Sequence, residues 1–203
     1  MNTLVILAHP NMAQSSLNKQ VIDELNKQPE QFTIHNLYET YPDEQINIEA
    51  EQRLIEEHDS IILQFPIYWY SCPSLLKKWI DETFAFNWAY GPEGHALENK
   101  PFALLVTTGA DATQYEAPGE TIEDILLPFK MTFHYTNADY KGFYTIYGPT
   151  TTKEAVESAA RFAGRIWLLY FLAWSPFAHP LYSLGGLWVG LLWRWPPFDH
   201  PSY

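Results

Sequence analysis

Short apolar runs alternate with amphipathic segments along most of the chain. Residues 3–8, 61–65 and 102–106 are almost continuously apolar, and residues 31–37 alternate around Phe32, Ile34 and Leu37. Continuous runs of this length are typical of strands buried on both faces of a parallel sheet, whereas alternation is typical of an outer strand. We therefore predict strands over residues 3–8, 31–37, 61–66 and 102–109, and residues 137–147 are a candidate fifth.

Helical spacing fills the intervals between these strands. Leu17, Val21 and Leu25 lie four residues apart and predict a helix that begins near Ser15 or Ser16. Further helices are predicted over residues 49–58, 74–86 and 122–133, with Pro128 expected to kink or break the last one, and over a segment capped by Thr151 or Thr152. Residues 38–48 read as a polar connection. The alternation of strand and helix predicts an α/β domain with right-handed crossovers.

The composition of the chain argues against several classes of partner and site. The net charge of -12 disfavours nucleic acid and anionic membranes as partners, because binding either depends on clustered Lys and Arg. A single cysteine, Cys72, excludes an internal disulfide and a cysteine-rich metal site. No signal peptide is recognisable at Met1, so we expect a cytoplasmic protein.

The composition changes near residue 170. Between residues 171 and 203 the charged residues are Arg194 and Asp199 alone, and four tryptophans crowd the segment. Pro176, Pro180 and the Gly185-Gly186 pair interrupt it, so it is too short for a transmembrane helix of about 20 residues. We expect one domain over residues 1–170 and an appended tail. The tail has three readings, in order: a packing or dimer-contact segment, a membrane-surface segment, or a translated non-native extension.

The loop over residues 9–18 has the features of an anion site. A helix N-terminus offers unpaired backbone N–H groups and the positive end of a dipole, and Ser15 and Ser16 add hydroxyl groups. His9 and Asn18 could orient the loop or reach a phosphate. The alternative is that Ser15 or Ser16 only caps the helix and that His9 is an ordinary turn residue.

Other catalytic classes lack their motifs. The sequence contains neither G-x-G-x-x-G nor G-x-x-x-x-G-K-[ST], and no G-x-S-x-G elbow. Its histidines have no zinc-site spacing, so no metal site is expected.

Three loops are expected to meet where the predicted strands end. They cover residues 9–18, 66–70 and 107–115, and the second is rich in aromatic residues. Ligands of open parallel sheets bind at this edge. A phosphate site beside flat side chains matches the needs of a flavin, and Gly109 would let the backbone approach the flavin ring. Taken without the other two loops, the aromatic residues of 66–70 could equally be core packing or part of a subunit interface.

The motifs in these loops carry a family resemblance. They are Leu7-Ala8-His9-Pro10 with Ser15 and Asn18; Gln64, Pro66, Trp69-Tyr70, Pro73, Leu75-Leu76-Lys77 and Trp79-Ile80-Asp81; Trp88-Ala89-Tyr90-Gly91; and Thr107-Thr108-Gly109. Together they resemble the flavodoxin-like NAD(P)H:quinone oxidoreductases, close to the ancillary flavoproteins of glutathione-regulated potassium efflux systems. The resemblance covers residues 3–166. It implies a three-layer α/β sandwich with a five-stranded parallel sheet in the order 2-1-3-4-5, and a homodimer.

The resemblance also implies site residues. Flavin phosphate and ribityl contacts fall at His9, Ser15, Ser16, Leu17 and Asn18; ring contacts fall at Pro66, Ile67, Tyr68, Trp69, Tyr70, Thr107, Thr108, Gly109 and Ala110. Tyr115 lies where the family has an aromatic residue near the flavin edge, and we expect it to be catalytic. Two departures stand out. Ala110 replaces the usual second glycine, and the histidine that follows Tyr115 in some members is absent, so no Tyr–His relay is expected.

The implied reaction is ping-pong, two-electron reduction of a quinone or similar aromatic acceptor by NAD(P)H. FMN is the expected cofactor, with FAD as the alternative. Two rival functions remain: a flavin-containing regulatory subunit in peripheral contact with a membrane transporter at the inner membrane face, and a one-electron carrier flavodoxin.

Overall fold

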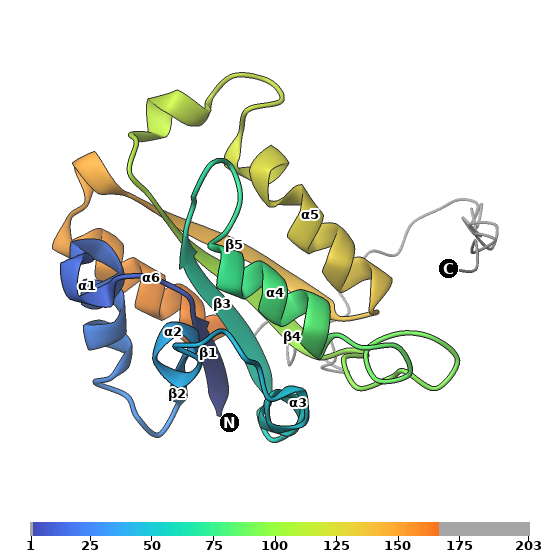
Figure 1. Ribbon diagram of the computed structural model, residues 1–203. Helices are drawn as coiled ribbons and strands as arrows, with labels where there is room; N and C mark the ends of the chain where they lie inside the picture. Colours follow the sequence, from blue (N-terminus) through green and yellow to red (C-terminus); the bar gives the residue numbers. More distant parts are fainter. Residues whose placement is uncertain (1, 167–203) are drawn as a thin grey trace, which may run out of the picture.

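The computed structural model describes residues 2–166 (Figure 1). Five parallel strands form one sheet in the order β2-β1-β3-β4-β5. Their bounds are β1 (Thr3–Leu7), β2 (Phe32–Asn36), β3 (Ser60–Pro66), β4 (Pro101–Thr108) and β5 (Asp139–Tyr147). The predicted strands and strand order are therefore confirmed. Expectations about the tail over residues 171–203, and about the end of the domain at residue 170, lie outside the described residues.

Helices cover both faces of the sheet. The helices are α1 (Ser16–Leu25), α2 (Leu37–Thr40), α3 (Ile48–Glu56), α4 (Ser74–Thr83), α5 (Ile122–Tyr135) and α6 (Lys153–Arg165), and three 3-10 turns are η1 (Met12–Gln14), η2 (Ala112–Tyr115) and η3 (Gly148–Thr150). Figure 1 shows α1 and α6 on one side of the sheet and the other helices on the opposite side. This arrangement is the three-layer sandwich expected from the sequence.

The layers follow from the alternation of side chains along the strands. Leu4 and Ile6 of β1 join the core beneath α2, α3, α4 and α5, whereas Val5 and Leu7 join the core beneath α1 and α6. Every residue of β1, β3 and β4 is buried. Buried on both faces, these strands need no polar positions, which explains their continuous apolar runs.

Two predictions about helices need correction. Residues 38–48 are not wholly a connection, because α2 occupies Leu37–Thr40. The break expected at Pro128 is wrong, because α5 continues through it. Pro128 and Asp124, whose carbonyl loses its helical partner, both lie on the exposed side of α5. Water can therefore replace the missing hydrogen bond.

No helix within residues 2–166 is long and apolar enough to cross a bilayer. The same residues assemble no group of three or more His, Cys, Asp or Glu side chains able to hold a metal ion.

A buried carboxylate joins β2, α3 and α4. The Glu51 side chain on α3 is 2% exposed. Its carboxylate accepts the Tyr41 hydroxyl at 2.5 Å and the Trp79 indole N–H at 2.7 Å, and it lies 2.9 Å from Nε2 of His35. Trp79 is itself fully buried on α4. Glu51 therefore fixes α4, the helix that follows the aromatic loop, although nothing in the sequence singled it out.

The charge state of Glu51 makes this contact sensitive to pH. Burial alone raises the pKa of Glu51, but hydrogen bonds from His35 and Tyr41 outweigh burial and hold the pKa below its usual value. Because the folded pKa lies below the unfolded one, the carboxylate stabilises the fold above about pH 4.3, and this contribution disappears as the pH falls through the folded pKa.

We expect Glu51→Gln to lower the free energy of unfolding at pH 7 by about 2–4 kcal/mol, because three partners lose a buried carboxylate. Urea unfolding at several pH values measures the difference from wild type, which should shrink below about pH 4. Glu49→Gln, an exposed position on the same helix, should change stability by less than about 0.5 kcal/mol. Equal unfolding midpoints for the two variants would contradict the assignment.

Candidate functional site

The carboxyl ends of β1, β3 and β4 bring the three loops together. In the sheet register Leu7 lies opposite Gln64, and Pro66 lies opposite Thr107. The Ile67 N–H also donates to the Thr107 carbonyl at 2.8 Å. The loops that follow these strands therefore share one edge of the sheet, as the sequence predicts.

The first loop ends in the N-terminus of α1. Ser15 is the N-cap, and its side chain accepts the backbone N–H of Asn18 at 3.3 Å. Helix geometry leaves the N–H groups of Ser16 and Leu17 without an intrahelical acceptor, so they are available to an anion. The predicted helix start is confirmed, and capping and anion binding are compatible here because they use different groups.

His9 lies between the first two loops. Its Nδ1 accepts the Asn11 N–H at 3.0 Å, and its ring meets the Tyr68 ring edge-on with centroids 6.4 Å apart. Partial burial lowers the pKa of His9. The neutral ring, with Nδ1 acting as acceptor, carries its proton on Nε2.

Residues 68–71 form a tight hairpin at the end of β3. Tyr68 and Ser71 exchange backbone hydrogen bonds of 3.0 and 2.9 Å across a two-residue turn, Trp69-Tyr70. Both turn residues have positive φ, 48° and 59°, which is the pattern of a type I′ turn that normally carries Asn-Gly. Left-handed backbone costs an ordinary residue about 1–2 kcal/mol, and such strain is concentrated at functional sites.

The aromatic side chains of this turn face solvent. Trp69 is 94% exposed and Tyr70 is 68% exposed. The alternative in which these rings are core packing is therefore wrong for the protomer. Indole and phenol rings held out by a strained turn are a surface that can meet a flat ligand or another protein.

The third loop combines buried threonines with open backbone. Thr107 and Thr108 are each 2% exposed, and the Thr108 hydroxyl donates to the Ala110 carbonyl at 2.7 Å. A Cβ atom added at Gly109 would meet nothing within 4 Å, so the space beside its Cα is free. The Tyr115 ring packs against Tyr147, with centroids 6.0 Å apart, which places Tyr115 beside the end of β5.

A residue that the sequence analysis missed supports this loop. A Cβ atom at Gly148 would lie 2.8 Å from the Thr108 carbonyl oxygen and 3.5 Å from Cδ1 of Leu17. Glycine is therefore required where the chain leaves β5 and passes between the third loop and α1. No local motif marks Gly148, because the crowding arises from segments distant in sequence.

Behind the loops lies a network of buried polar side chains. Asn18 donates through Nδ2 to Oγ of Ser15 at 3.0 Å and to Oγ1 of Thr107 at 3.1 Å. Its Oδ1 accepts Nε2 of Gln64 at 3.0 Å. Asn18 is 2% exposed and Gln64 is fully buried. The network ties α1, β3 and β4 together directly beneath the site.

These features fit a flavin mononucleotide. The unpaired N–H groups of Ser16 and Leu17 suit its phosphate, the open side of Gly109 admits a ring close to the backbone, and the exposed rings of residues 68–70 suit its flat surface. Of the residues that the resemblance assigned to the flavin, Asn18 and Thr107 are each 2% exposed and their side chains hydrogen-bond each other, so these two side chains lie behind the loop surface. The other predicted site residues line the shared edge.

The fold and this edge of the sheet define a flavodoxin-like protein. A family model described as Flavodoxin-like fold matches residues 1–166, and the chain belongs to this family. The resemblance seen in the sequence is thereby confirmed.

Proteins similar in sequence to this chain include an oxidoreductase and an ancillary protein of a potassium-efflux system. The chain is 41% identical over 164 residues to the uncharacterized NAD(P)H oxidoreductase YrkL of Bacillus subtilis, covering 79% of this chain and 94% of the relative. It is 38% identical over 168 residues to the glutathione-regulated potassium-efflux system ancillary protein KefG of Yersinia enterocolitica, covering 81% and 91%.

Solved structures similar to this chain include an FMN complex and a quinone reductase. General stress protein 14 of Treponema denticola, crystallised in complex with FMN, superposes with a TM-score of 0.76 at 43% identity, covering 83% of this chain and 99% of that one. An NADPH-quinone reductase from P. pentosaceus superposes with a TM-score of 0.71 at 30% identity, covering 80% and 98%.

We expect Tyr70→Gly to raise the free energy of unfolding by about 0.5–1 kcal/mol, because glycine adopts positive φ without strain and the exposed ring contributes little packing. Tyr68→Gly is the matched control, since Tyr68 lies outside the left-handed region and contacts His9; it should be destabilising. Urea unfolding of the flavin-free proteins measures both. Equal destabilisation by the two changes would show that the turn is unstrained.

Proposed function

We propose that the protein is an FMN-dependent oxidoreductase that uses NAD(P)H to reduce quinones or similar aromatic acceptors. The observation that carries the proposal is the meeting, at one sheet edge, of a helix N-terminus, an exposed aromatic turn and the open backbone of Gly109. FMN in a 43% identical structure, and the oxidoreductase names of two other relatives, support it. We further propose a cytoplasmic location.

Different residues bind the phosphate and the ring of FMN in this proposal. Ser15, Ser16 and Leu17 hold the phosphate through the hydroxyl and N–H groups that begin α1. Residues 66–70 and 107–110 provide the ring site, and His9 joins the first two loops through Tyr68. Bound FMN supplies the ring that accepts hydride from the nicotinamide and returns it to the acceptor.

The third loop, residues 107–115, would stabilise negative charge on the flavin ring. The backbone N–H groups of residues 108–110 would stabilise negative charge on the ring of bound FMN, because fixed amide dipoles stabilise charge without reorganisation. Tyr115, held against Tyr147, is placed to donate its hydroxyl hydrogen to the ring edge or to the oxygen of the acceptor.

We expect Gly109→Ala to weaken FMN binding by about tenfold or more while leaving the fold intact, because the added methyl meets no protein atom but enters the space assigned to the ring. Fluorescence titration of the flavin-free protein with FMN measures the affinity. Gly164→Ala on α6, whose Cβ would have only Gln31 at 3.9 Å, should bind FMN as wild type does. Unchanged FMN affinity in Gly109→Ala would remove this loop from the site.

We expect Tyr115→Phe to lower the rate of quinone reduction by about 10²-fold, the smaller end of a general-acid contribution, with FMN still bound. Stopped-flow measurement of the two half-reactions separates the two roles: a loss confined to the oxidative step assigns the hydroxyl to the acceptor, and a loss in the reductive step assigns it to the ring edge. A variant that turns over at the wild-type rate would exclude Tyr115 from catalysis.

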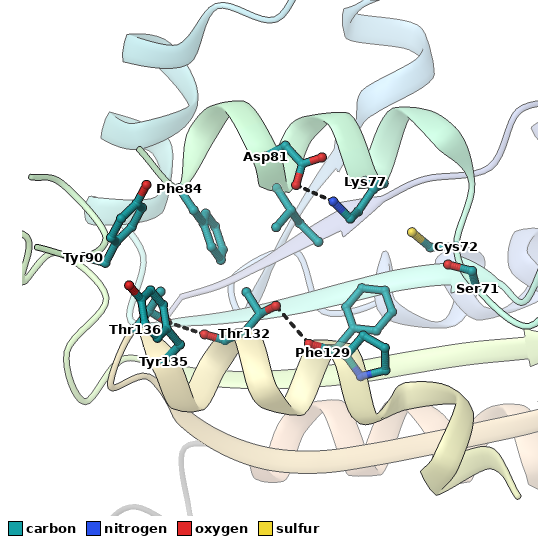
Figure 2. Close-up of a pocket in the computed structure, with 12 residues that line it drawn as sticks. Ser71, Cys72, Lys77, Asp81, Phe84, Tyr90, Phe129, Thr132, Tyr135 and Thr136 are labelled. Atoms are coloured by element: carbon teal, nitrogen blue, oxygen red, sulfur yellow. Dashed lines mark hydrogen bonds and ion pairs between the residues drawn. The ribbon is translucent and has the colours of Figure 1, made fainter. Parts of the chain in front are cut away.

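We also propose that the protein is a homodimer joined along α4 and α5. A groove of about 290 Å³ lies between these helices, lined by Ser71, Cys72, Lys77, Tyr90, Phe129, Tyr135 and neighbouring residues (Figure 2). Along α5, Leu127, Met131 and Tyr135 lie four residues apart and are 48%, 57% and 59% exposed, and Tyr135 also lines the groove. A continuous apolar stripe beside a groove is the surface of a self-association interface.

We expect Met131→Lys to shift the protein from dimer to monomer in analytical ultracentrifugation, because burying an unpaired ammonium at the interface is unfavourable. Lys130→Met, at the adjacent position of the same helix, should leave the assembly unchanged. A wild-type protein that sediments as a 23.5 kDa monomer at micromolar concentration would overturn the dimer.

The similarity to KefG, over 91% of that protein, favours a second function: a flavin-containing subunit that acts through contact with a transporter. The two functions differ in turnover by the isolated protein. Steady quinone reduction by NAD(P)H supports the enzyme, whereas FMN binding without such turnover supports the subunit.

A further inference from the structure

Gln64, at the end of β3, has no assigned part in the proposed function. It is fully buried, and Asn18, which it contacts, is 2% exposed. A ligand at the sheet edge therefore cannot reach the Gln64 amide. Its Nε2 nevertheless donates to Oδ1 of Asn18 at 3.0 Å, directly behind the N-terminus of α1. Buried amides are costly to place, so this contact calls for a physical role.

The contact determines which way the Asn18 amide faces. With Oδ1 turned toward Gln64, Nδ2 is turned toward Oγ of Ser15 at 3.0 Å and Oγ1 of Thr107 at 3.1 Å. The reverse orientation of both amides would leave the Gln64 amino group, in place of its Oε1, at the position without a partner among residues 2–166. Unpaired buried N–H groups are rarer than unpaired carbonyls, so the observed orientation is the favoured one.

The orientation of Asn18 in turn sets the role of Ser15. The Ser15 oxygen accepts two hydrogens, from Nδ2 of Asn18 at 3.0 Å and from the backbone N–H of Asn18 at 3.3 Å. A hydroxyl has two acceptor positions and one donor hydrogen. With both acceptor positions filled, the Ser15 hydroxyl has only its hydrogen left to offer, at a helix N-terminus beside the N–H groups of Ser16 and Leu17 that lack an intrahelical acceptor.

We infer that Gln64 is a positioning residue, which acts through Asn18 to commit the Ser15 hydroxyl to donating toward an anionic ligand, the phosphate of FMN. The inference rests on the proposed function, because it assumes that the phosphate lies at α1. Without the Gln64 donor, the Asn18 amide can turn, place Oδ1 against Ser15 and draw the hydroxyl hydrogen inward. The site then loses a donor to phosphate while its ring-binding surface is unchanged.

Comparing FMN with riboflavin isolates the phosphate. Gln64→Met keeps the length of the side chain and removes its donor. We expect it to weaken FMN binding by about tenfold or more, the range of a hydrogen bond to a charged group, and to change riboflavin binding by less than about twofold. Fluorescence titration of the flavin-free protein gives both affinities. Gln64→Leu, which also removes the amide, should lower the FMN-to-riboflavin preference in the same way and serves if Gln64→Met does not fold.

A matched control separates positioning from stability. Ser60 lies at the opposite end of the same strand, where its buried hydroxyl pairs with that of Thr3 at 2.8 Å. Ser60→Ala should lower the thermal midpoint, as a lost buried hydrogen bond does, and leave the FMN-to-riboflavin preference unchanged. An equal loss of preference in Ser60→Ala and Gln64→Met would mean that Gln64 acts only through the stability of the fold, and the inference would be wrong.

A double-mutant cycle tests the route through Ser15. Ser15→Ala should itself reduce the preference for FMN, and adding Gln64→Met to it should cause no further loss, because both changes remove one donor. Additive losses would show that Gln64 acts by another path. If Ser15→Ala reduces the preference and Gln64→Met does not, the inference fails and the proposed site stands. If Ser15→Ala leaves the preference unchanged, the Ser15 hydroxyl does not donate to the phosphate and the inference fails, whereas failure of the proposed function shows separately as a protein that does not bind FMN.

Discussion

Burial of β1, β3 and β4 on both faces is the constraint from which the rest of the structure follows. Because helices cover both faces of the sheet, these three central strands are buried along their whole length, and the chain reaches solvent only beyond their two ends. Parallel pairing then sends every strand-to-helix connection out of the same edge, so loops far apart in sequence must share it. The grouping of the loops after Ala8, Pro66 and Thr108 is thus a consequence of the sheet.

Polar groups placed inside such a core require full pairing, and this protein places two sets there. Glu51 is satisfied by Tyr41, Trp79 and His35, and it fixes α4 against α3. Asn18 is satisfied by Gln64, Thr107 and Ser15, and it fixes α1 against the sheet. The first set lies under the helix that follows the aromatic turn, and the second lies under the loop over residues 9–18. Both therefore hold the loops in place from behind, where low dielectric strengthens their hydrogen bonds.

The sequence predicts the strands, most helices and the meeting of the loops, because these follow from local periodicity and parallel topology. It also marks Ser15 and Gly109, whose residue types are unusual enough to signal an N-cap and a close backbone approach. It gives no signal for Glu51 or Gly148, and it marks Gln64 only as part of the family motif, without its buried role. Their roles depend on partners 28, 40 and 46 positions away, among them Trp79, Thr108 and Asn18. The left-handed turn at Trp69-Tyr70 is missed for the opposite reason: aromatic residues argue against the conformation they adopt.

That turn shows where the surrounding structure overrides the local preference of the residues. Asn-Gly would form it without strain, so the two aromatic residues are retained at a cost of about 1–2 kcal/mol each. The flanking structure can impose this conformation because Pro66 and Pro73 are both buried and the Ile67 N–H is anchored to Thr107. A rigid support fixes the backbone of the turn, and with it the direction in which the two Cβ atoms leave the chain, before any ligand arrives. The stability of the buried sheet is thus what allows a strained turn at its edge to hold two aromatic residues out toward solvent.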